Sequence, residues 1–509
     1  MQRAVSILLG VVLAACGARE PERPNLLLIT VDTLRADRMG LYGAARDTTP
    51  DLDAFARECV VLDAAQTPRS KTTPAIASLL SGLYPHAHGV RDLATPLSER
   101  VPLLQETLRE RGYRTGAIVG NWVLGDARSG LARGFDVWCE SMPDRSGVPP
   151  DDVPQRTARS LTEAALVALG ASTPSAPVSE SERDPELRLT RGDAPWFLWL
   201  HYMDPHGAYE PPAEHRLFER ERVDLLDVHA PQAANAEHKR RLALYNVPEH
   251  AWVDADHIDA ALVRDLYDGE LHYVDREIGR LLQTLRASGQ LERTVVVVTA
   301  DHGESLGEHD YWFEHGAYTY ESTARVPLIV RAPGLAALRV AEPFSLVDLA
   351  PTLKELLGLE LAQSGATDAL RGRSKLAAWR GAAAGAGAIF SEKVEGATLE
   401  GAVQLKAVRI GRWKLIQRYA LRASRPGAPS EIVALGEELF DLAADPLEAW
   451  NLSSAVPGGA PLLELRRELA RFVAADRDLA ALGELLAARR RGLEISDPDA
   501  ARTLRLLGY

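Results

Sequence analysis

The sequence predicts an α/β fold with a large, mostly parallel central sheet, followed by a small C-terminal α+β subdomain. The chain has 509 residues, which is enough for one large domain and an appendage. Three segments, residues 26–31, 196–200 and 294–300, are apolar or β-branched at every position. Strands of a parallel sheet that is covered by helices on both faces have this composition, because neither face meets solvent.

Polar side chains that suit catalysis or metal binding follow each of these three predicted strands. They are Asp32 after the first strand, His201 and His206 after the second, and Asp301 and His302 after the third. The carboxyl ends of parallel strands lie at one edge of the sheet, where α/β folds bind their ligands. We therefore expect these residues to converge on an active site.

The other predicted elements lie between and after these strands. In chain order they are a helical surface excursion at residues 213–260, an amphipathic helix at 347–357, short strands at 404–409, 413–417 and 438–441, and a helix at 461–490. A stretch rich in Ala and Gly at 377–388 is typical of a domain boundary. We therefore divide the chain into a catalytic domain at 24–380 and a C-terminal subdomain at 381–509.

The composition restricts the possible partners. With 46% hydrophobic and 25% charged residues the chain is typical of a soluble globular protein. Its net charge of -13 argues against nucleic acid as a partner, because phosphate backbones would be repelled. An anionic substrate would need a local source of positive charge, and a bound metal ion is the obvious one. The sequence identifies no protein partner.

The N-terminus predicts export and lipid anchoring. A positively charged start precedes an apolar run at residues 4–13, which is too short to span a bilayer. The run ends in Leu-Ala-Ala-Cys, which resembles the bacterial lipobox, in which the cysteine, here Cys16, is acylated. We expect a signal peptide at 1–16, a polar tether at 17–23 and a lipid-anchored location in the bacterial cell envelope, facing the periplasm or on the outer membrane. A plain secretory signal with a coincidental cysteine is the alternative.

Only Cys59 and Cys139 would remain in the mature chain. An oxidising compartment would permit a disulfide between them. The alternative is that each is a small buried hydrophobic residue. The sequence leaves both possibilities open.

Thr72 stands at the start of a short predicted helix that Gly82 can close. Its hydroxyl would lie where the backbone N–H groups and the dipole of the helix favour an anion. A nucleophile or an anion-binding residue would fit this place. The simpler alternative is an ordinary N-cap threonine.

Several segments in the same order resemble the sulfatase family of the alkaline phosphatase superfamily. They are residues 24–43, 72–86, 301–309, 315–329, 406–415 and 438–446. The resemblance extends from about residue 24 to residue 455. It implies an alkaline-phosphatase-like sandwich and an enzyme that cleaves an anionic ester.

The resemblance also implies roles for individual residues. Asp32, Asp301 and His302 would bind one or two divalent metal ions, either Zn, Mn or Ca, and Thr72 would be both a metal ligand and the nucleophile. A hydroxyl needs such a metal, because coordination lowers its pKa and the cation neutralises the transferred group. The side chains proposed to contact the substrate, protonate the leaving group or bind a second metal ion are His206 and His315. Further candidate substrate-binding residues are His201, His309 and Asn121.

This sequence departs from the family pattern at several positions. Sulfatases usually have Cys or Ser at the position of Thr72, which is converted to formylglycine, and threonine cannot be converted by that route. Ile76 replaces an Arg, and Thr33 replaces an acidic residue, which makes a carboxylate-rich calcium site less favourable. Asn121 and Val123 replace a Lys and a His that bind sulfate in the family.

Three functions are therefore open. The first is a phosphoester hydrolase or transferase that uses Thr72 as its nucleophile. The second is a sulfuric ester hydrolase that works without formylglycine. The third is a binding lipoprotein that has kept the fold and lost catalysis. In the first two the substrate is an anionic ester, whose alcohol could belong to a lipid or a glycan.

Overall fold

The computed structural model describes the following residues: 23–142, 155–171, 189–190, 193–219, 223–231, 240–359, 371–383, 385, 387–393, 403–423, 430–455 and 459–476. The predicted signal peptide, Cys16 and all but the last residue of the predicted tether lie outside these ranges. Within them, no helix combines the length and the apolar character that crossing a bilayer requires.

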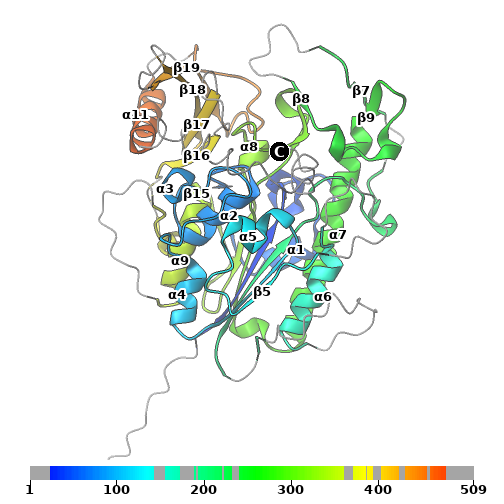
Figure 1. The fold of residues 1–509 in the computed structure, drawn as a ribbon, viewed down its shortest axis with the longest axis vertical. Coiled ribbons are helices and arrows are strands. Elements are labelled where there is room, and N and C mark those ends of the chain that lie inside the picture. Colours follow the sequence, from blue (N-terminus) through cyan, green and yellow to red (C-terminus); the bar gives the residue numbers. More distant parts are fainter. Residues whose placement is uncertain are drawn as a thin grey trace, which may run out of the picture.

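An eight-stranded sheet forms the centre of the molecule, in the order β14-β2-β13-β10-β1-β6-β4-β5. Its strands are β1 Asn25–Val31, β2 Val60–Leu62, β4 Arg114–Val119, β5 Val137–Cys139, β6 Trp196–Tyr202, β10 Thr294–Ala300, β13 Leu328–Arg331 and β14 Leu338–Val340. Only the pairs that β13 makes with β10 and β2 are antiparallel. The predicted large, mostly parallel sheet is confirmed (Figure 1).

The three predicted apolar strands lie side by side in this sheet. β1 pairs in parallel with β10 on one side and with β6 on the other. Every residue of these strands is buried, which is why their sequences show no alternation. Val31, the last residue of β1, is level with Ala300 and Tyr202. The polar residues that follow therefore emerge at one edge.

Helices cover both faces of the sheet (Figure 1). One group consists of α1 Pro50–Ala56, α6 Ala158–Ala168 and α7 Ala260–Ala287, with α7 in contact with both of the others. The other consists of α2 Thr72–Ser81, α4 Leu104–Glu110 and α9 Leu349–Leu356, with α2 in contact with both of its neighbours. The predicted amphipathic helix at 347–357 corresponds to α9 and a preceding 3-10 turn, Leu346–Asp348.

The C-terminal part contains a four-stranded antiparallel sheet and one helix. The strands are β16 Ile389–Lys393, β17 Val403–Ile410, β18 Trp413–Ala423 and β19 Ser430–Asp441. The helix α11, Ala460–Ala475, packs Leu462, Leu465 and Phe472 on this sheet. β18 and β19 are longer than predicted. The rest of the helix predicted at 461–490 lies outside the described residues.

The segment predicted as a helical excursion at 213–260 contains no α-helix in its described part before α7 begins at Ala260, so that prediction was wrong. It contains the strands β7 Leu225–Asp227, β8 Arg241–Leu242 and β9 His257–Asp259, and the 3-10 turns η5 Ala213–His215, η6 Leu244–Asn246 and η7 Glu249–Ala251. β7 pairs with β9, and β8 pairs with β12, Tyr311–Glu314. These tertiary partners satisfy backbone groups that a helix would have paired locally.

Cys59 and Cys139 do not form a disulfide. Both are free and buried. Cys59 directly precedes β2 and Cys139 ends β5, and six inter-strand steps of about 4.8 Å separate these strands. A disulfide requires Cα atoms less than about 7 Å apart. The interpretation as buried hydrophobic residues is therefore the correct one.

A buried ion-pair cluster connects the C-terminal helix to the catalytic domain. Asp476, which follows α11, bonds through Oδ2 to Arg91 Nη1 at 2.9 Å and to Lys406 Nζ at 2.8 Å. Burial alone would raise the pKa of the Asp476 carboxyl, but the charges of Lys406 and Arg91 outweigh it and lower that pKa. The carboxylate is therefore stabilised in the folded protein.

Replacing Asp476 with asparagine is expected to destabilise the protein by about 3 kcal/mol at pH 7, because Arg91 and Lys406 would lose a buried partner. The folded pKa lies below the unfolded value, so this contribution is present above about pH 4 and is lost as the pH falls through the folded pKa. Urea unfolding at pH 7 and pH 3.5 measures both effects. The control is Asp63→Asn in the exposed pair with Arg339, expected to cost less than about 1 kcal/mol. An equal loss in both variants would contradict the prediction.

Candidate active site

Asp32, Asp301 and His302 meet at the carboxyl edge of the central sheet. Asp32 follows β1, and Asp301 and His302 follow the neighbouring strand β10. All three side chains are completely buried. One ligand atom from each lies within 4.8 Å of the others, which is the separation that three ligands of one metal ion can adopt.

The ring of His302 presents a lone pair to the two carboxylates. Its Nδ1 donates a hydrogen bond to the Gly303 carbonyl at 3.0 Å, so the proton of the neutral ring is on that atom. Nε2 lies 3.3 Å from Asp301 Oδ2 and 3.7 Å from Asp32 Oδ1. Burial and the neighbouring His315 lower the pKa of His302 well below its ordinary value. The ring is therefore neutral and can bind a metal through Nε2.

The two carboxylates fit a divalent cation. Asp32 Oδ1 and Asp301 Oδ2 are buried and accept no hydrogen bond. Burial and the charge of Asp32 raise the pKa of Asp301 well above its ordinary value. Two buried acidic groups side by side need a source of positive charge, and an ion held by Asp32, Asp301 and His302 would supply it. This donor set of two oxygens and one nitrogen is compatible with Zn²⁺ or Mn²⁺.

Thr72 lies beside this cluster. It is the first residue of α2, is buried, and its Oγ1 is 3.4 Å from His302 Nε2. The N-cap position belongs to Lys71, so the interpretation of Thr72 as the cap is wrong. The hydroxyl instead lies at the positive end of the helix dipole, where negative charge on an attacking oxygen is favoured.

His206 and His315 lie next to the candidate metal site formed by Asp32, Asp301 and His302. The ring of His315 is 4.3 Å from that of His302 and 5.3 Å from that of His206, between ring centroids. His206 Nδ1 donates to the Gly207 carbonyl at 3.1 Å, so Nε2 of the neutral ring is unprotonated. The structure thus brings both predicted catalytic histidines to the site.

Glu304, for which no role was predicted, lies within hydrogen-bonding distance of His315. Glu304 is completely buried, and its Oε1 lies 3.2 Å from His315 Nδ1. The Tyr209 hydroxyl donates to its Oε2 at 3.1 Å. Burial raises the pKa of Glu304 to about 8. The signal that could have found it is its position in the segment 301–309, three residues after Asp301.

Asn121 and His201 were predicted to bind substrate. In the structure both side chains contact Oδ2 of Asp32. Asn121 Nδ2 donates to Asp32 Oδ2 at 2.7 Å, and its Oδ1 accepts from the Val123 backbone N–H. His201 Nε2 lies 3.3 Å from the same Asp32 oxygen, and its Nδ1 is 2.9 Å from the Thr30 hydroxyl. Both side chains are buried and use their polar atoms to orient Asp32.

Replacing Asn121 with alanine is expected to weaken metal binding by about 10- to 100-fold, because hydrogen bonds to a ligating carboxylate orient it. Asp32 Oδ1, the oxygen that faces the metal site, is not touched by the substitution. Calorimetric titration of the metal-free protein with Mn²⁺ or Zn²⁺ measures the effect. An unchanged dissociation constant would show that Asn121 has no part in ordering Asp32.

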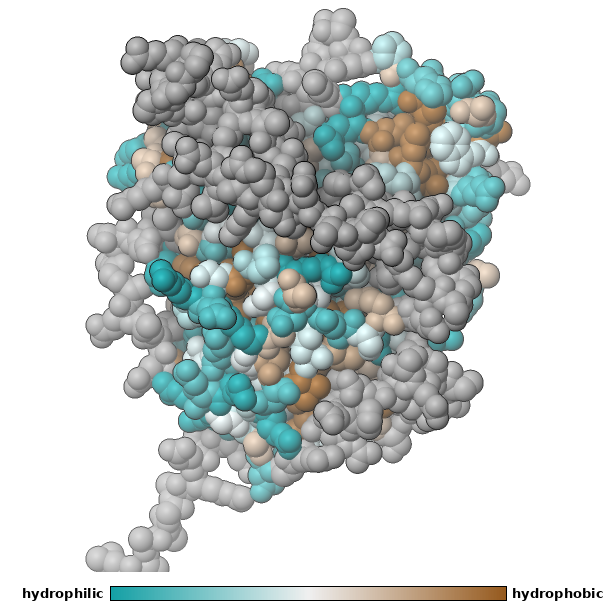
Figure 2. All heavy atoms as spheres, in the orientation of Figure 1, coloured by the Kyte–Doolittle hydropathy of each residue, from teal (hydrophilic) through white to brown (hydrophobic). Residues whose placement is uncertain are grey.

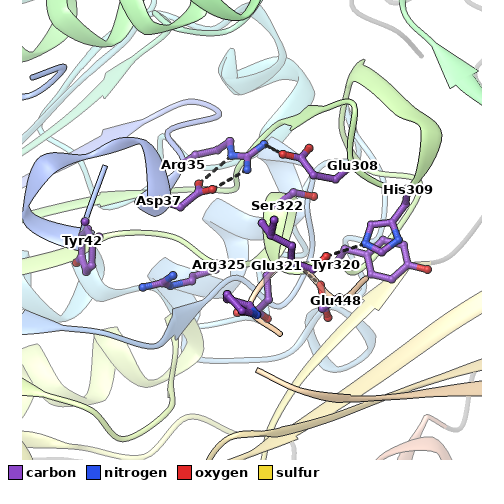
Figure 3. Close-up of a pocket in the computed structure, with 13 residues that line it drawn as sticks. Arg35, Asp37, Tyr42, Glu308, His309, Tyr320, Glu321, Ser322, Arg325 and Glu448 are labelled. Carbon is purple, nitrogen blue, oxygen red and sulfur yellow. Dashed lines mark hydrogen bonds and ion pairs between the residues drawn. The ribbon is translucent and has the colours of Figure 1, made fainter. Parts of the chain in front are cut away.

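His309 is not among the three side chains that meet in the candidate metal site, and its assignment as a substrate-binding residue stays a prediction. Its ring stacks on Tyr320 with centroids 3.6 Å apart, and its Nε2 is 3.2 Å from the Leu447 carbonyl. Figure 3 shows it in a separate pocket, on the side opposite Tyr42. Local sequence could not distinguish this position, because the backbone of His309 turns through a left-handed conformation with φ 57°.

Arg35 connects the two loops that carry the candidate metal ligands. Its Nη1 donates to the Glu304 carbonyl and lies 2.9 Å from Glu308 Oε1, and its Nη2 bonds Asp37 at 2.7 Å (Figure 3). The guanidinium is buried. It therefore connects the loop that follows β1 to the loop that follows β10.

Comparison with known proteins gives the family. The family model described as Sulfatase matches residues 24–359. The chain belongs to the sulfatase family. This confirms the family that the sequence motifs predicted, and it makes the protein an ester hydrolase.

This sulfatase-family protein is similar to two relatives that have different names. The chain is 28% identical over 463 residues to a choline-sulfatase of Rhizobium meliloti, covering 85% of this chain and 82% of the relative. It is 30% identical over 401 residues to the multifunctional alkaline phosphatase superfamily protein PehA of Trinickia caryophylli, covering 66% and 74%.

Solved structures confirm the fold of this sulfatase-family protein. The phosphonate monoester hydrolase of Agrobacterium radiobacter superposes with a TM-score of 0.65 at 22% identity, over 89% of this chain and 95% of the other. The protein BT4656, solved in complex with its substrate D-glucosamine-2-N,6-O-disulfate, superposes with a TM-score of 0.63 at 21% identity. The superposition covers 90% of this chain and 98% of the other. The predicted alkaline-phosphatase-like sandwich is therefore confirmed.

Proposed function

We propose that this protein is a metal-dependent phosphoester hydrolase in which Thr72 is the nucleophile. The observation that carries the proposal is the position of the Thr72 hydroxyl, 3.4 Å from a histidine nitrogen that faces two buried carboxylates. A divalent ion bound by Asp32, Asp301 and His302 would lower the pKa of that hydroxyl and neutralise charge on the substrate.

The reaction follows from the surrounding side chains. The Thr72 hydroxyl gives its proton to the Nε2 lone pair of His206 or His315, its Oγ1 attacks the phosphorus atom, and the bond from phosphorus to the leaving alcohol oxygen breaks. The same histidine then returns that proton from Nε2 to the leaving oxygen. Glu304 keeps Nδ1 of His315 occupied, so Nε2 is the atom that faces the substrate. Water then cleaves the Thr72 ester and regenerates the hydroxyl.

Two departures from the family pattern favour a phosphorus ester over a sulfate ester as the substrate. Threonine at position 72 cannot become formylglycine by the route that sulfatases resembling this chain use. Asn121 is bonded to Asp32 and Val123 is buried and apolar, so neither supplies the positive charge that the family uses to bind sulfate.

A sulfuric ester hydrolase is the second candidate. The relative at 28% identity covers more of this chain than the one at 30% identity, and it is a choline-sulfatase. In this alternative Thr72 would bind the metal while a water molecule attacks sulfur.

The substrate class is tested by turnover of p-nitrophenyl sulfate, bis(p-nitrophenyl) phosphate and p-nitrophenyl phenylphosphonate, each after reconstitution with Mn²⁺ or Zn²⁺. We expect kcat/KM for a phosphorus ester to exceed that for the sulfate by at least about tenfold. Faster cleavage of the sulfate would overturn the phosphoester proposal in favour of the second candidate. If none of the three substrates were turned over, both candidate functions would be wrong.

We also propose that Cys16 is acylated and that the protein is anchored in the bacterial cell envelope. The apolar run at 4–13 and the Leu-Ala-Ala-Cys sequence support this proposal. Labelled palmitate should be incorporated into the full chain in bacterial cells and not into Cys16→Ser. Equal labelling of the two would refute acylation at this residue.

A further inference from the structure

An anionic substrate needs more positive charge at the candidate active site than a metal ion would supply. The charge of a divalent ion would be balanced by the carboxylates of Asp32 and Asp301, so the ester would still lack a counter-charge. Three positions at which the family pattern has a cationic or imidazole side chain are uncharged here, namely Ile76, Asn121 and Val123. A different side chain is therefore needed to supply the positive charge.

Lys71 is next to both the proposed nucleophile and the proposed catalytic His315. It directly precedes Thr72 and is the N-cap residue of α2, although its side chain makes no capping hydrogen bond. A Cβ atom placed on Gly316 would be 2.9 Å from Lys71 Cε and 3.0 Å from its Cγ. The lysine side chain therefore lies across Gly316 as closely as a glycine permits, and Gly316 directly follows His315. The segment of the nucleophile thus packs on the segment of the histidine through Lys71.

The charge of Lys71 acts on His315. The pKa of His315 is lowered to about 3, first by burial and then by the neighbouring His206. The positive charges of Lys71 and Arg69 act in the same direction. Arg69 is buried, and its Nη1 donates to the Gly316 carbonyl at 2.8 Å. Two cationic side chains therefore lie against the segment that carries His315.

The ammonium group of Lys71 is only partly compensated by its partner. Lys71 Nζ lies 2.7 Å from Asp92 Oδ1, and the lysine side chain is 16% exposed whereas that of Asp92 is 39% exposed. Burial lowers the pKa of Lys71, and the charge of Asp92 does not fully restore it. A second anion beside the ammonium would therefore be favourable.

The main hydrophobic patch of the visible surface is separate from this site. Figure 2 shows a large group of hydrophobic side chains where Figure 1 draws β7 and β9, well away from α2 in the same view. Hydrophilic side chains cover much of the face where Figure 1 draws α4 and α5. Segments that are apart in one view are apart in space. The residues beside Thr72 therefore offer a ligand charge and not an extended apolar surface.

We propose that Lys71 is a substrate-binding residue, whose ammonium group donates a hydrogen bond to a non-bridging oxygen of the ester that Thr72 attacks. The inference rests on the proposed function, because that function places the ester at Thr72. Asp92 keeps the ammonium group beside Gly316 when no substrate is bound. Lys71 then takes the part of the cations that the family pattern has at other positions.

The test compares two variants that break the same ion pair from opposite sides. Lys71→Met keeps the length of the side chain and removes its charge. Asp92→Asn keeps Lys71 and removes the negative charge beside it, and the amide oxygen can still accept from the Leu93 N–H, as Asp92 Oδ1 does at 2.9 Å. Calorimetry measures the binding of inorganic phosphate to the metal-loaded protein, and thermal unfolding shows that each variant is folded.

The two variants are expected to change phosphate binding in opposite directions. The dissociation constant should rise by about tenfold or more in Lys71→Met, because a hydrogen bond between charged groups is lost. It should fall by about two- to fivefold in Asp92→Asn, because no carboxylate competes for Nζ. An ion pair with a purely structural role would respond equally to the loss of either partner. Equal weakening in both variants, or unchanged affinity in Lys71→Met, would overturn the proposal.

Steady-state kinetics separates this inference from the proposed function. With the p-nitrophenyl ester that is cleaved fastest, Lys71→Met should raise KM and the inhibition constant of phosphate, and Lys71→Arg should reverse most of this change. If that ester were the sulfate, the proposed function would be wrong, and phosphate binding would still decide the role of Lys71. If it were a phosphorus ester and Lys71→Met had the KM of the wild type, only the proposal for Lys71 would be wrong.

Discussion

Replacing Thr72 with valine is expected to lower kcat/KM by at least about a thousandfold, because valine has the shape of threonine but no nucleophilic oxygen. Thr72→Ser retains the oxygen, and we expect its kcat/KM to fall by less than about tenfold. The substitutions occur at a buried residue on the first turn of α2, so the large effect must be separated from damage to the fold. Thermal unfolding of each variant supplies that comparison.

Thr73→Val is a matched control for this experiment. Thr73 is also buried, is the second residue of the same helix, and its Oγ1 has no hydrogen-bond partner. Its hydroxyl can therefore be removed at little cost, and the activity should stay within about threefold of the wild type. Substantial ester cleavage by Thr72→Val would mean that water, and not Thr72, attacks the substrate.

Replacing Asp301 with asparagine is expected to have opposite effects on activity and on the stability of the metal-free protein. Activity should fall by about a thousandfold or more, because an amide is a poor ligand for the ion. The metal-free protein, however, should be stabilised by about 1–3 kcal/mol at pH 7, because Asp301 and Asp32 are two buried acids without a counter-charge.

The pH dependence follows from the raised pKa of Asp301. A carboxyl whose folded pKa lies above its unfolded value costs stability at neutral pH, and this cost disappears as the pH falls toward about 4. The advantage of Asp301→Asn over the metal-free wild type should therefore shrink between pH 7 and pH 4.5. Differential scanning calorimetry with chelator and with added metal measures both effects.

Metal should reverse the order of stability. An ion at 100 times its dissociation constant stabilises the wild type by about 2.7 kcal/mol and should leave the variant nearly unchanged. If Asp301→Asn were less stable than the wild type in chelator, the two carboxylates would not repel each other in the metal-free protein. If added metal stabilised both equally, Asp301 would not be a ligand.

The sequence was sufficient to locate the three central strands and the residues that follow them. β1, β6 and β10 are apolar throughout, and that composition reports burial on both faces directly. Asp32 and Asp301 converge because neighbouring parallel strands end at the same edge. The convergence of these carboxylates could thus be predicted from local composition together with one rule of sheet topology.

The segment at 213–260 could not be predicted in the same way. Its described elements are two- or three-residue strands and turns, which are too short to produce a periodic pattern. β8 is a strand only because β12, about 70 residues later in the chain, supplies its hydrogen bonds.

By itself, then, the sequence determined the fold class, the family and the strands that bring Asp32, Asp301 and His302 together, because burial and motif order are encoded in short stretches of chain. Only the tertiary structure decided which partner each polar side chain meets. Asn121 and His201 bond Asp32 from 89 and 169 residues away, and Thr72 meets His302 across 230 residues. Such partners depend on distances of a few ångströms between remote segments, and no local pattern of residues encodes those distances.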